Sequence, residues 1–365
     1  MTDTAAMNTS SAPSPIAVTM GDAAGVGPEL CLKLLNETSF AEHSVPVIIG
    51  SAKLLERAAK QTGIPFKAEV FEKFPVAPHV VKVPSVWDHP QAFGIAEVMA
   101  GRNQQSCGKA SALFIQTAAK ACQDGLCAAM VTAPISKKSL ELAGINFPGH
   151  TEYIAHLTGS PRVAMLLYSP KLAVAFATSH QSLRSVPDSL NGDRIVEVAT
   201  LLNLFLKRLR NGDAPRLAIL GLNPHAGEEG LFGSEDQQII APAVMRLRSL
   251  GINAEGPLPP DTAFTPHALG KFHGHVALYH DQGGIPFKMC SFDTGANVTL
   301  GLDIIRTSPD HGTAFDIAWQ GKADTGSFFA AYALAARLAR PVRGNTGSNR
   351  TPAMRLTPVN GVRAL

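Results

Sequence analysis

The stretch Ile16-Ala-Val-Thr-Met20 is a nearly continuous apolar run, and it leads through the loop Gly21-Asp-Ala-Ala-Gly-Val-Gly27 to Pro28 and Glu29. Such a run is typical of a strand buried on both faces of a parallel sheet. Pro28 suits the first turn of a helix, and Glu29 would lie near its positive end. The stretch therefore predicts a strand–loop–helix unit. The loop has neither GxGxxG spacing nor the Lys-Ser/Thr of a P-loop, so its glycines indicate a tight turn or a loop lining a cleft.

The same pattern recurs along the chain, with short apolar runs separated by helical patterns. The predicted strands are Ile16–Met20, Val45–Gly50, Ala128–Thr132, Leu172–Thr178, Arg216–Leu222 and Val276–Tyr279, and the predicted helices are Pro28–Asn36, Ala52–Thr62, Lys109–Asp124, Asp193–Arg210, Asp236–Leu250 and Ser327–Arg340. Alternating strands and helices predict an α/β fold with a mostly parallel sheet and crossover connections.

Composition excludes several classes of function. The 365 residues favour two domains or one large domain with insertions, and 45% apolar content is enough to bury a sizeable core. The net charge of +3 is explained by six arginines between Arg337 and Leu365, a segment without an acidic residue. Because the remainder is slightly acidic, we expect no nucleic-acid partner.

The chain also lacks signals for export or membrane insertion. No apolar run approaches the ~20 residues that span a bilayer, and residues 1–14 have neither a basic nor an apolar region typical of a secretory signal. The five cysteines include no CxxC pair, which indicates reduced thiols. We therefore expect a cytoplasmic protein with a disordered leader at residues 1–14 and a flexible basic tail at 343–365.

Three histidines each follow a predicted strand. His180 comes after Leu172–Thr178, His225 after Arg216–Leu222, and His280 after Val276–Tyr279. If the strands are parallel, all three imidazoles emerge at one edge of the sheet, where ligands of open α/β sheets bind. A lone histidine at such a place is usually an ordinary loop residue. Three at equivalent positions predict a site for zinc or a similar divalent cation, with coordination left open to substrate.

Two carboxylates lie close to these histidines in the sequence. Asp281 follows His280 directly, and Asp261 ends the segment Gly256-Pro-Leu-Pro-Pro-Asp261. Either side chain suits orientation of an imidazole or proton transfer. A turn-capping role explains each aspartate about as well.

An anion pocket is suggested by separate pieces of sequence. Thr151 precedes a predicted helix at Tyr153–Leu157 and suits its N-terminal cap, a position that attracts anions. Lys288 and Arg306 each end an apolar stretch, where an unpaired charge would be costly to bury, although a solvated strand end is the commoner explanation. Asn297 lies in a Gly-rich apolar run between them.

A final motif, Asp310-His311-Gly312-Thr-Ala-Phe-Asp316, combines a short glycine loop with a carboxylate. Such a loop suits backbone contact with a nucleotide, with Asp316 on the ribose hydroxyls. A loop that leads into a capped helix explains the motif nearly as well.

Together, six motifs resemble the 4-hydroxythreonine-4-phosphate dehydrogenases of pyridoxal phosphate synthesis, including their D-threonate and D-erythronate 4-phosphate dehydrogenase sister group. The resemblance runs from about Ile16 to Leu338 and is carried by Thr19-Met-Gly-Asp-Ala-Ala-Gly-Val-Gly-Pro-Glu29, Gly149-His-Thr-Glu152, Leu222-Asn-Pro-His-Ala-Gly-Glu228, Gly256-Pro-Leu-Pro-Pro-Asp261, Tyr279-His-Asp-Gln-Gly283 and Asn297-Val-Thr-Leu-Gly-Leu302. The chain departs from the family at Ala23, where a proline is usual, and at Asp293, where a neutral or basic residue is expected.

The resemblance implies an isocitrate/isopropylmalate-dehydrogenase-like fold, in which two α/β/α domains flank a cleft, and a homodimer with a shared active site. The implied domains are residues 15–150 plus 295–342 on the nucleotide side and residues 151–294 on the metal and dimer side. It implies one divalent metal per site, with zinc ahead of magnesium or cobalt, and NAD ahead of NADP. The implied residues are His180, His225 and His280 on the metal, His150, Thr151, Lys288, Asn297 and Arg306 on the substrate, His311, Gly312 and Asp316 on the cofactor, and Asp261, Asp281 and Lys288 in proton transfer.

The expected reaction is oxidation of the 3-hydroxyl of 4-hydroxythreonine 4-phosphate by NAD, followed by decarboxylation to 3-amino-2-oxopropyl phosphate. D-threonate or D-erythronate 4-phosphate is the alternative substrate. A cis-dihydrodiol dicarboxylate dehydrogenase and a metallo-hydrolase are further alternatives, and the latter would need no nicotinamide. A metal- or phosphate-binding protein without catalysis is a third class.

Overall fold

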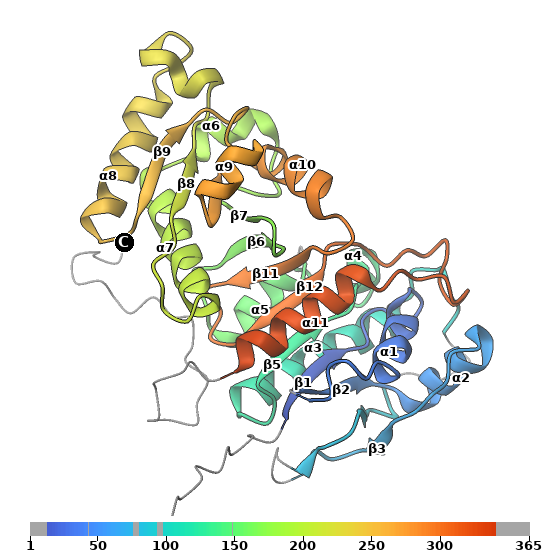
Figure 1. The fold of residues 1–365 in the computed structure, drawn as a ribbon. Helices are drawn as coiled ribbons and strands as arrows, with labels where there is room; N and C mark the ends of the chain where they lie inside the picture. The colour runs from blue at the N-terminus through green and yellow to red at the C-terminus, as the bar shows by residue number, and fades with distance from the viewer. Residues whose placement is uncertain (1–12, 43, 76–79, 93–97, 148, 341–365) are drawn as a thin grey trace, which may run out of the picture.

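The computed structural model describes residues 13–42, 44–75, 80–92, 98–147 and 149–340 (Figure 1). The strands are β1 Ser14–Thr19, β2 Ser44–Gly50, β3 Glu69–Phe71, β4 Ser85–Asp88, β5 Ala129–Thr132, β6 Ala164–Tyr168, β7 Ala173–Phe176, β8 Leu217–Leu220, β9 Ala254–Leu258, β10 Gly274–Ala277, β11 Ala296–Leu300 and β12 Arg306–Pro309. The helices are α1 Gly27–Leu35, α2 Ala52–Thr62, α3 Gln105–Gln123, α4 Lys137–Leu142, α5 His150–Thr158, η3 Leu183–Ser185, α6 Val186–Ser189, α7 Gly192–Leu209, η4 Pro224–Gly230, η5 Asp236–Ile240, α8 Ala241–Ser249, α9 Pro266–Lys271, α10 His280–Ser291 and α11 Gly326–Ala339. The predicted leader and tail lie almost wholly outside these described residues.

The strands form one twelve-stranded sheet in the order β3-β4-β2-β1-β5-β12-β11-β6-β7-β10-β8-β9. Pairing is parallel from β3 to β12 and again from β7 to β9. Three antiparallel contacts, β12 with β11, β11 with β6, and β6 with β7, join the two parallel sections. The predicted α/β class and mostly parallel sheet are therefore confirmed, whereas the proposed domain boundaries stay a prediction.

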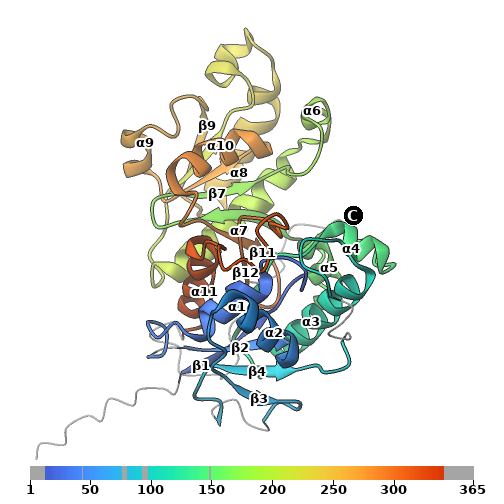
Figure 2. The same cartoon turned by 90° about the vertical axis from the view of Figure 1, so that its right-hand side faces the viewer.

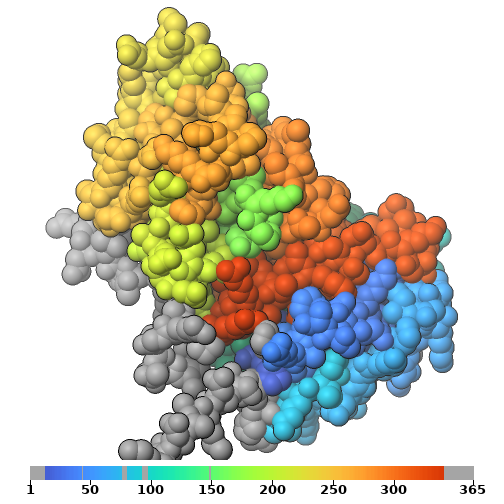
Figure 3. Space-filling model, viewed as in Figure 1, coloured from blue at the N-terminus to red at the C-terminus, as the bar shows by residue number. Residues whose placement is uncertain are grey.

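Helices cover both faces of the sheet, which makes most strands buried. Figure 2 shows α11 and α3 on opposite sides of it, with α11 against β12 and β5 and α3 against β1 and β5. In the space-filling view, the α9–α10 segment stands above the surface of α11 and the loop before it (Figure 3). Within the described residues, no helix is both long and apolar enough to cross a membrane.

Helix α10 positions the candidate site, and it was missed in the sequence because Gly283, Gly284 and Pro286 are poor helix formers. Packing explains why the helix forms. A Cβ on Gly283 would lie 2.5 Å from Val174 Cγ1, so only glycine lets the helix approach β7 this closely. Phe287, on the same helix, is fully buried, which stabilises it by roughly 2–3 kcal/mol.

Candidate functional site

The three predicted metal ligands follow three adjacent strands. β10 pairs in parallel with β7 on one side and β8 on the other, so the carboxyl ends of all three point to one edge of the sheet. His180 follows β7, His225 lies in η4 after β8, and His280 is the first residue of α10 after β10. The predicted neighbourhood of these strand ends is confirmed.

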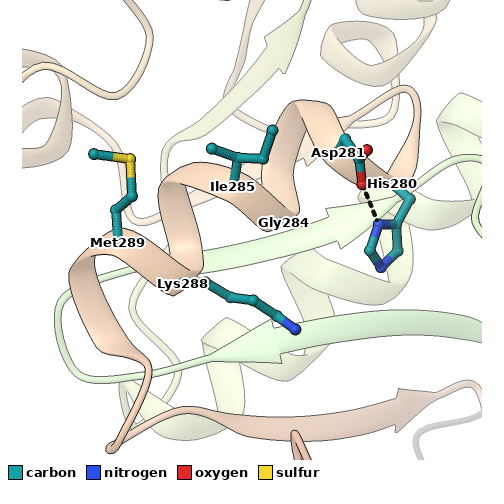
Figure 4. Close-up of a pocket in the computed structure, with 6 residues that line it drawn as sticks. All are labelled: His280, Asp281, Gly284, Ile285, Lys288 and Met289. Carbon is teal, nitrogen blue, oxygen red and sulfur yellow. Dashed lines mark hydrogen bonds and ion pairs between the residues drawn. The ribbon is translucent and has the colours of Figure 1, made fainter.

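Two of the three imidazoles lie together. The ring centroids of His180 and His280 are 5.8 Å apart. His280 Nδ1 is 2.7 Å from Asp281 Oδ1, which orients the ring and leaves Nε2 available (Figure 4). Burial lowers the pKa of His180, and the nearby charges of Lys137 and His280 lower it further. Imidazole nitrogens are common ligands of divalent cations such as zinc, and a carboxylate commonly orients them.

The third histidine lies apart from this pair. The His225 ring contacts Phe232, with ring centroids 6.1 Å apart. Among the residues that the structure describes, no three His, Cys, Asp or Glu side chains are close enough to hold one metal ion. One chain therefore brings together two of the predicted ligands, and the three-histidine site stays a prediction.

The η4 loop that carries His225 has an unusual backbone. His225, Ala226, Glu228 and Glu229 all adopt positive φ angles, between 40° and 56°. Non-glycine residues pay roughly 1 kcal/mol or more each for this conformation, so surrounding contacts must enforce it.

Two buried polar side chains, neither singled out in the sequence, fix the strand ends. Asp236 is fully buried, and its carboxylate accepts hydrogen bonds from the backbone N–H groups of Leu222 and Asn223 at 2.8 and 3.1 Å. Gln282 accepts from Leu278 N and donates to Gly221 O, both at 2.7 Å, which ties the end of β10 to the end of β8. Only the folded structure could reveal these roles, because isolated Asp and Gln residues carry no distinguishing pattern.

A buried cation marks the predicted anion pocket. Arg306 on β12 is 3% exposed, and burial lowers its pKa to about 10, so its guanidinium remains charged at neutral pH. Nε and Nη2 donate to Thr132 Oγ1 at 3.2 and 2.7 Å, and Nη1 donates to Thr299 Oγ1 at 3.0 Å. These bonds use three of five N–H groups, which leaves one on each terminal nitrogen for a ligand.

Helix α5 brings two more predicted substrate residues to this guanidinium. Thr151 Oγ1 lies 3.5 Å from Thr299 Oγ1. Burial moves the pKa of His150 well below its usual value, with a further contribution from the Arg306 charge, and its Nε2 is buried without a partner. The suggestion that Thr151 caps the helix was wrong, because Gly149 occupies the N-cap and Thr151 lies in the first turn.

The remaining predicted substrate residues lie on β11 and α10. Asn297 is two residues from Thr299 on β11, hence on the same face of the sheet, and its buried Oδ1 has no partner. Lys288 lines a shallow pocket on α10 together with His280, Asp281, Gly284, Ile285 and Met289 (Figure 4). Its Nζ is 3.5 Å from Asp310 Oδ2, a residue that follows β12.

Electrostatic coupling connects the anion pocket with the histidine pair. The Glu152 carboxylate raises the pKa of Arg306 and also that of His180, opposing the larger effect of burial on each. The Glu152 carboxylate therefore lies within electrostatic range of both groups, which indicates that Arg306 and the imidazoles are near each other.

The predicted cofactor loop packs on the first glycine loop. Val26 N donates to Thr313 O at 3.0 Å, and Trp319 Nε1 donates to Ala23 O at 3.0 Å. Asp316 and Gly312 are exposed, whereas His311 Nε2 is buried without a partner. Asp261 is exposed in the turn after β9, and in the described part of the chain no hydrogen bond or ion pair joins it to His280 or Lys288.

Comparison with known proteins agrees with this geometry. Residues 42–335 match the family model described as pyridoxal phosphate biosynthetic protein PdxA. A 4-hydroxythreonine-4-phosphate dehydrogenase from Desulforapulum autotrophicum is 41% identical over 92% of this chain and 97% of its own. A D-threonate 4-phosphate dehydrogenase from Pectobacterium atrosepticum is 42% identical over 89% of this chain and 99% of its own.

A solved structure gives the same result for the fold. The 4-hydroxythreonine-4-phosphate dehydrogenase of Klebsiella pneumoniae superposes with a TM-score of 0.79 at 41% identity, covering 90% of this chain and all of that one. The family model covers most of the chain, and the relatives match it nearly end to end. This protein therefore belongs to the PdxA family of dehydrogenases.

Proposed function

We propose that this chain oxidises a four-carbon hydroxy-acid phosphate with NAD and a divalent cation, and that 4-hydroxythreonine 4-phosphate is the substrate. Its 3-hydroxyl carbon becomes a ketone as a hydride passes to nicotinamide, and loss of CO2 then yields 3-amino-2-oxopropyl phosphate. D-threonate 4-phosphate is the second candidate, because relatives with either name are almost equally similar to this chain.

One observation carries the proposal. The Glu152 carboxylate acts on the pKa of both Arg306 and His180, which indicates that the buried guanidinium lies near the paired imidazoles. A phosphate on Arg306, with Thr151 and Lys288 beside it, would therefore direct the other end of a short substrate toward the histidines. The two free N–H groups of Arg306 match the bidentate geometry that phosphate prefers.

The other predicted site residues would bind the cation, orient its ligands, move a proton and bind the nucleotide. His180, His225 and His280 would hold the cation, which supplies Lewis acidity that stabilises negative charge on the reacting oxygen. Asp281 bonds to His280 Nδ1 and so fits the orientation of that ring better than proton transfer. Lys288 remains a candidate for moving a proton because it lines one pocket with His280, whereas no described hydrogen bond or ion pair joins Asp261 to either residue. The loop His311–Asp316 would carry the nucleotide, with Asp316 on the ribose.

The separated His225 supports a homodimer with a shared site. Leu231 and Phe232, close to His225 in sequence, are 73% and 45% exposed, and Ile285 and Met289 on α10 are 58% and 83% exposed. Large apolar side chains exposed beside incomplete ligand sets mark surfaces that a partner covers. We propose that a second copy buries them and brings His225 and His280 of different chains to one cation.

A substrate panel tests the function directly. Purified protein with added zinc, magnesium or cobalt is mixed with NAD and each acid phosphate, and the absorbance of reduced nicotinamide is followed. We expect turnover with 4-hydroxythreonine 4-phosphate and a kcat/KM lower by roughly 100-fold or more for the same acid without phosphate, because charge-assisted hydrogen bonds to Arg306 and Lys288 are lost.

Two outcomes would contradict the proposal. Product formation that proceeds equally well without NAD would indicate a hydrolase. Metal binding without turnover of any acid phosphate would indicate a binding protein. Preference for D-threonate 4-phosphate would retain the reaction class and replace the substrate.

A further inference from the structure

Asp310 and Lys288 form an ion pair between two different parts of the fold. Lys288 lies on α10, which packs on β7 and β10, whereas Asp310 follows β12 and precedes the cofactor loop. The two charged atoms are 3.5 Å apart, with 43% of the lysine side chain exposed and 17% of the aspartate side chain. The carboxylate is therefore the more deeply held partner of this ion pair.

The backbone of Asp310 is anchored, whereas the Lys288 side chain is long and partly exposed. Asp310 N donates to Ser327 Oγ at 2.9 Å, and that hydroxyl donates to Gly295 O at 2.6 Å. Pro309, just before it, is paired with Ala296 in the sheet. Lys288 has a flexible four-carbon side chain, and ordering it costs roughly 2 kcal/mol. The anchored carboxylate is therefore suited to determine where the ammonium lies.

Basic side chains lie near the Asp310 carboxyl. Lys288 contacts the carboxylate, and His280 and His311 are within electrostatic range of it. Burial raises the pKa of Asp310, and these three basic groups oppose the rise. A fixed carboxylate among basic groups is suited to hold one of them in place.

We propose that Asp310 is a positioning residue that holds the Lys288 ammonium beside His280, ready for the phosphorylated substrate. The proposal rests on the proposed function for its kinetic consequence. Pre-ordering the lysine avoids its entropic cost at the moment of binding, so losing Asp310 should weaken substrate capture through Lys288 and not independently of it.

Kinetics of a double-mutant cycle test this dependence. We expect Asp310→Asn to lower kcat/KM by roughly 10- to 30-fold, mainly through KM, since about 1.4–2 kcal/mol of ordering is lost. Asp310→Glu should recover part of the loss. Asp293→Asn, which removes an equal charge at an exposed position, should change kcat/KM less than about twofold.

In a Lys288→Met background, Asp310→Asn should lower kcat/KM by less than about a further threefold. Additive losses would overturn the proposal.

A measurement that needs no turnover separates this inference from the proposed function. The rate at which Lys288 is acylated in the full-length protein is followed by mass spectrometry, because an amine paired with a carboxylate reacts slowly. Asp310→Asn should raise this rate by about threefold or more, with no change in Asp293→Asn. An unchanged rate would refute the pairing even in an active enzyme, whereas a raised rate in a protein that turns over no acid phosphate would refute only the function.

Discussion

Replacement of His225 by alanine is expected to abolish turnover, with a fall in kcat of about 1,000-fold or more, because loss of a ligand removes the cation and its stabilisation of charge. Bound metal, measured by elemental analysis after dialysis, should fall in parallel. The thermal midpoint without added metal should change little, since His225 is exposed and its one described ring contact is with Phe232.

A matched variant controls for the loss of any exposed histidine. His267→Ala removes an exposed histidine from α9. It should keep both activity and metal content. If His225→Ala keeps the metal content of the wild type, His225 is not a ligand.

The second large effect is expected for Arg306→Lys, which keeps the charge and removes the planar fork. KM for the acid phosphate should rise by roughly 100-fold, because lysine cannot bond Thr132 and Thr299 and also offer two parallel donors to phosphate. The change is measured by steady-state kinetics, together with binding of the phosphorylated and unphosphorylated acids by calorimetry.

The control must share the cost of removing a partly buried guanidinium. Arg208→Lys on α7 does so, because Arg208 is partly buried and its Nε donates to Leu338 O at 2.9 Å outside the anion pocket. It should leave KM within about twofold of the wild type. An unchanged KM in Arg306→Lys, or equal losses for the phosphorylated and unphosphorylated acids, would remove Arg306 from the phosphate site.

The fold was largely predictable where buried strands have a continuous apolar sequence. β1, β2 and β5 are continuous apolar runs, and their structural bounds differ from the predicted ones by one or two residues. β12, with the sequence Arg306-Thr-Ser-Pro309, has no apolar pattern, yet all four residues are buried because the sheet continues on both sides of it. Tertiary packing overrides composition there, as it does at the Gly- and Pro-containing helix α10.

The sequence predicted where the site lies on the sheet better than it predicted which side chains contact one another there. The positions of His180, His225 and His280 after predicted parallel strands placed them at one edge of the sheet. The strands β7, β10 and β8 are indeed adjacent. It could not reveal that the backbone of η4 turns His225 toward Phe232. Asp310 lay inside a motif interpreted as a nucleotide loop, and its partner Lys288 lies on a helix that the sequence did not predict. Pairings between distant segments have no local pattern to reveal them.

Mixed dimers test most directly the claim that one cation is held by histidines of two chains. His225→Ala and His280→Ala, each inactive alone, are co-expressed with different tags, and the doubly tagged species is purified. In that hybrid one of two sites has all three histidines, so about half of the wild-type activity per dimer should return, with about one bound metal ion. A hybrid that stays inactive and metal-free, although it forms stably, would contradict the shared site.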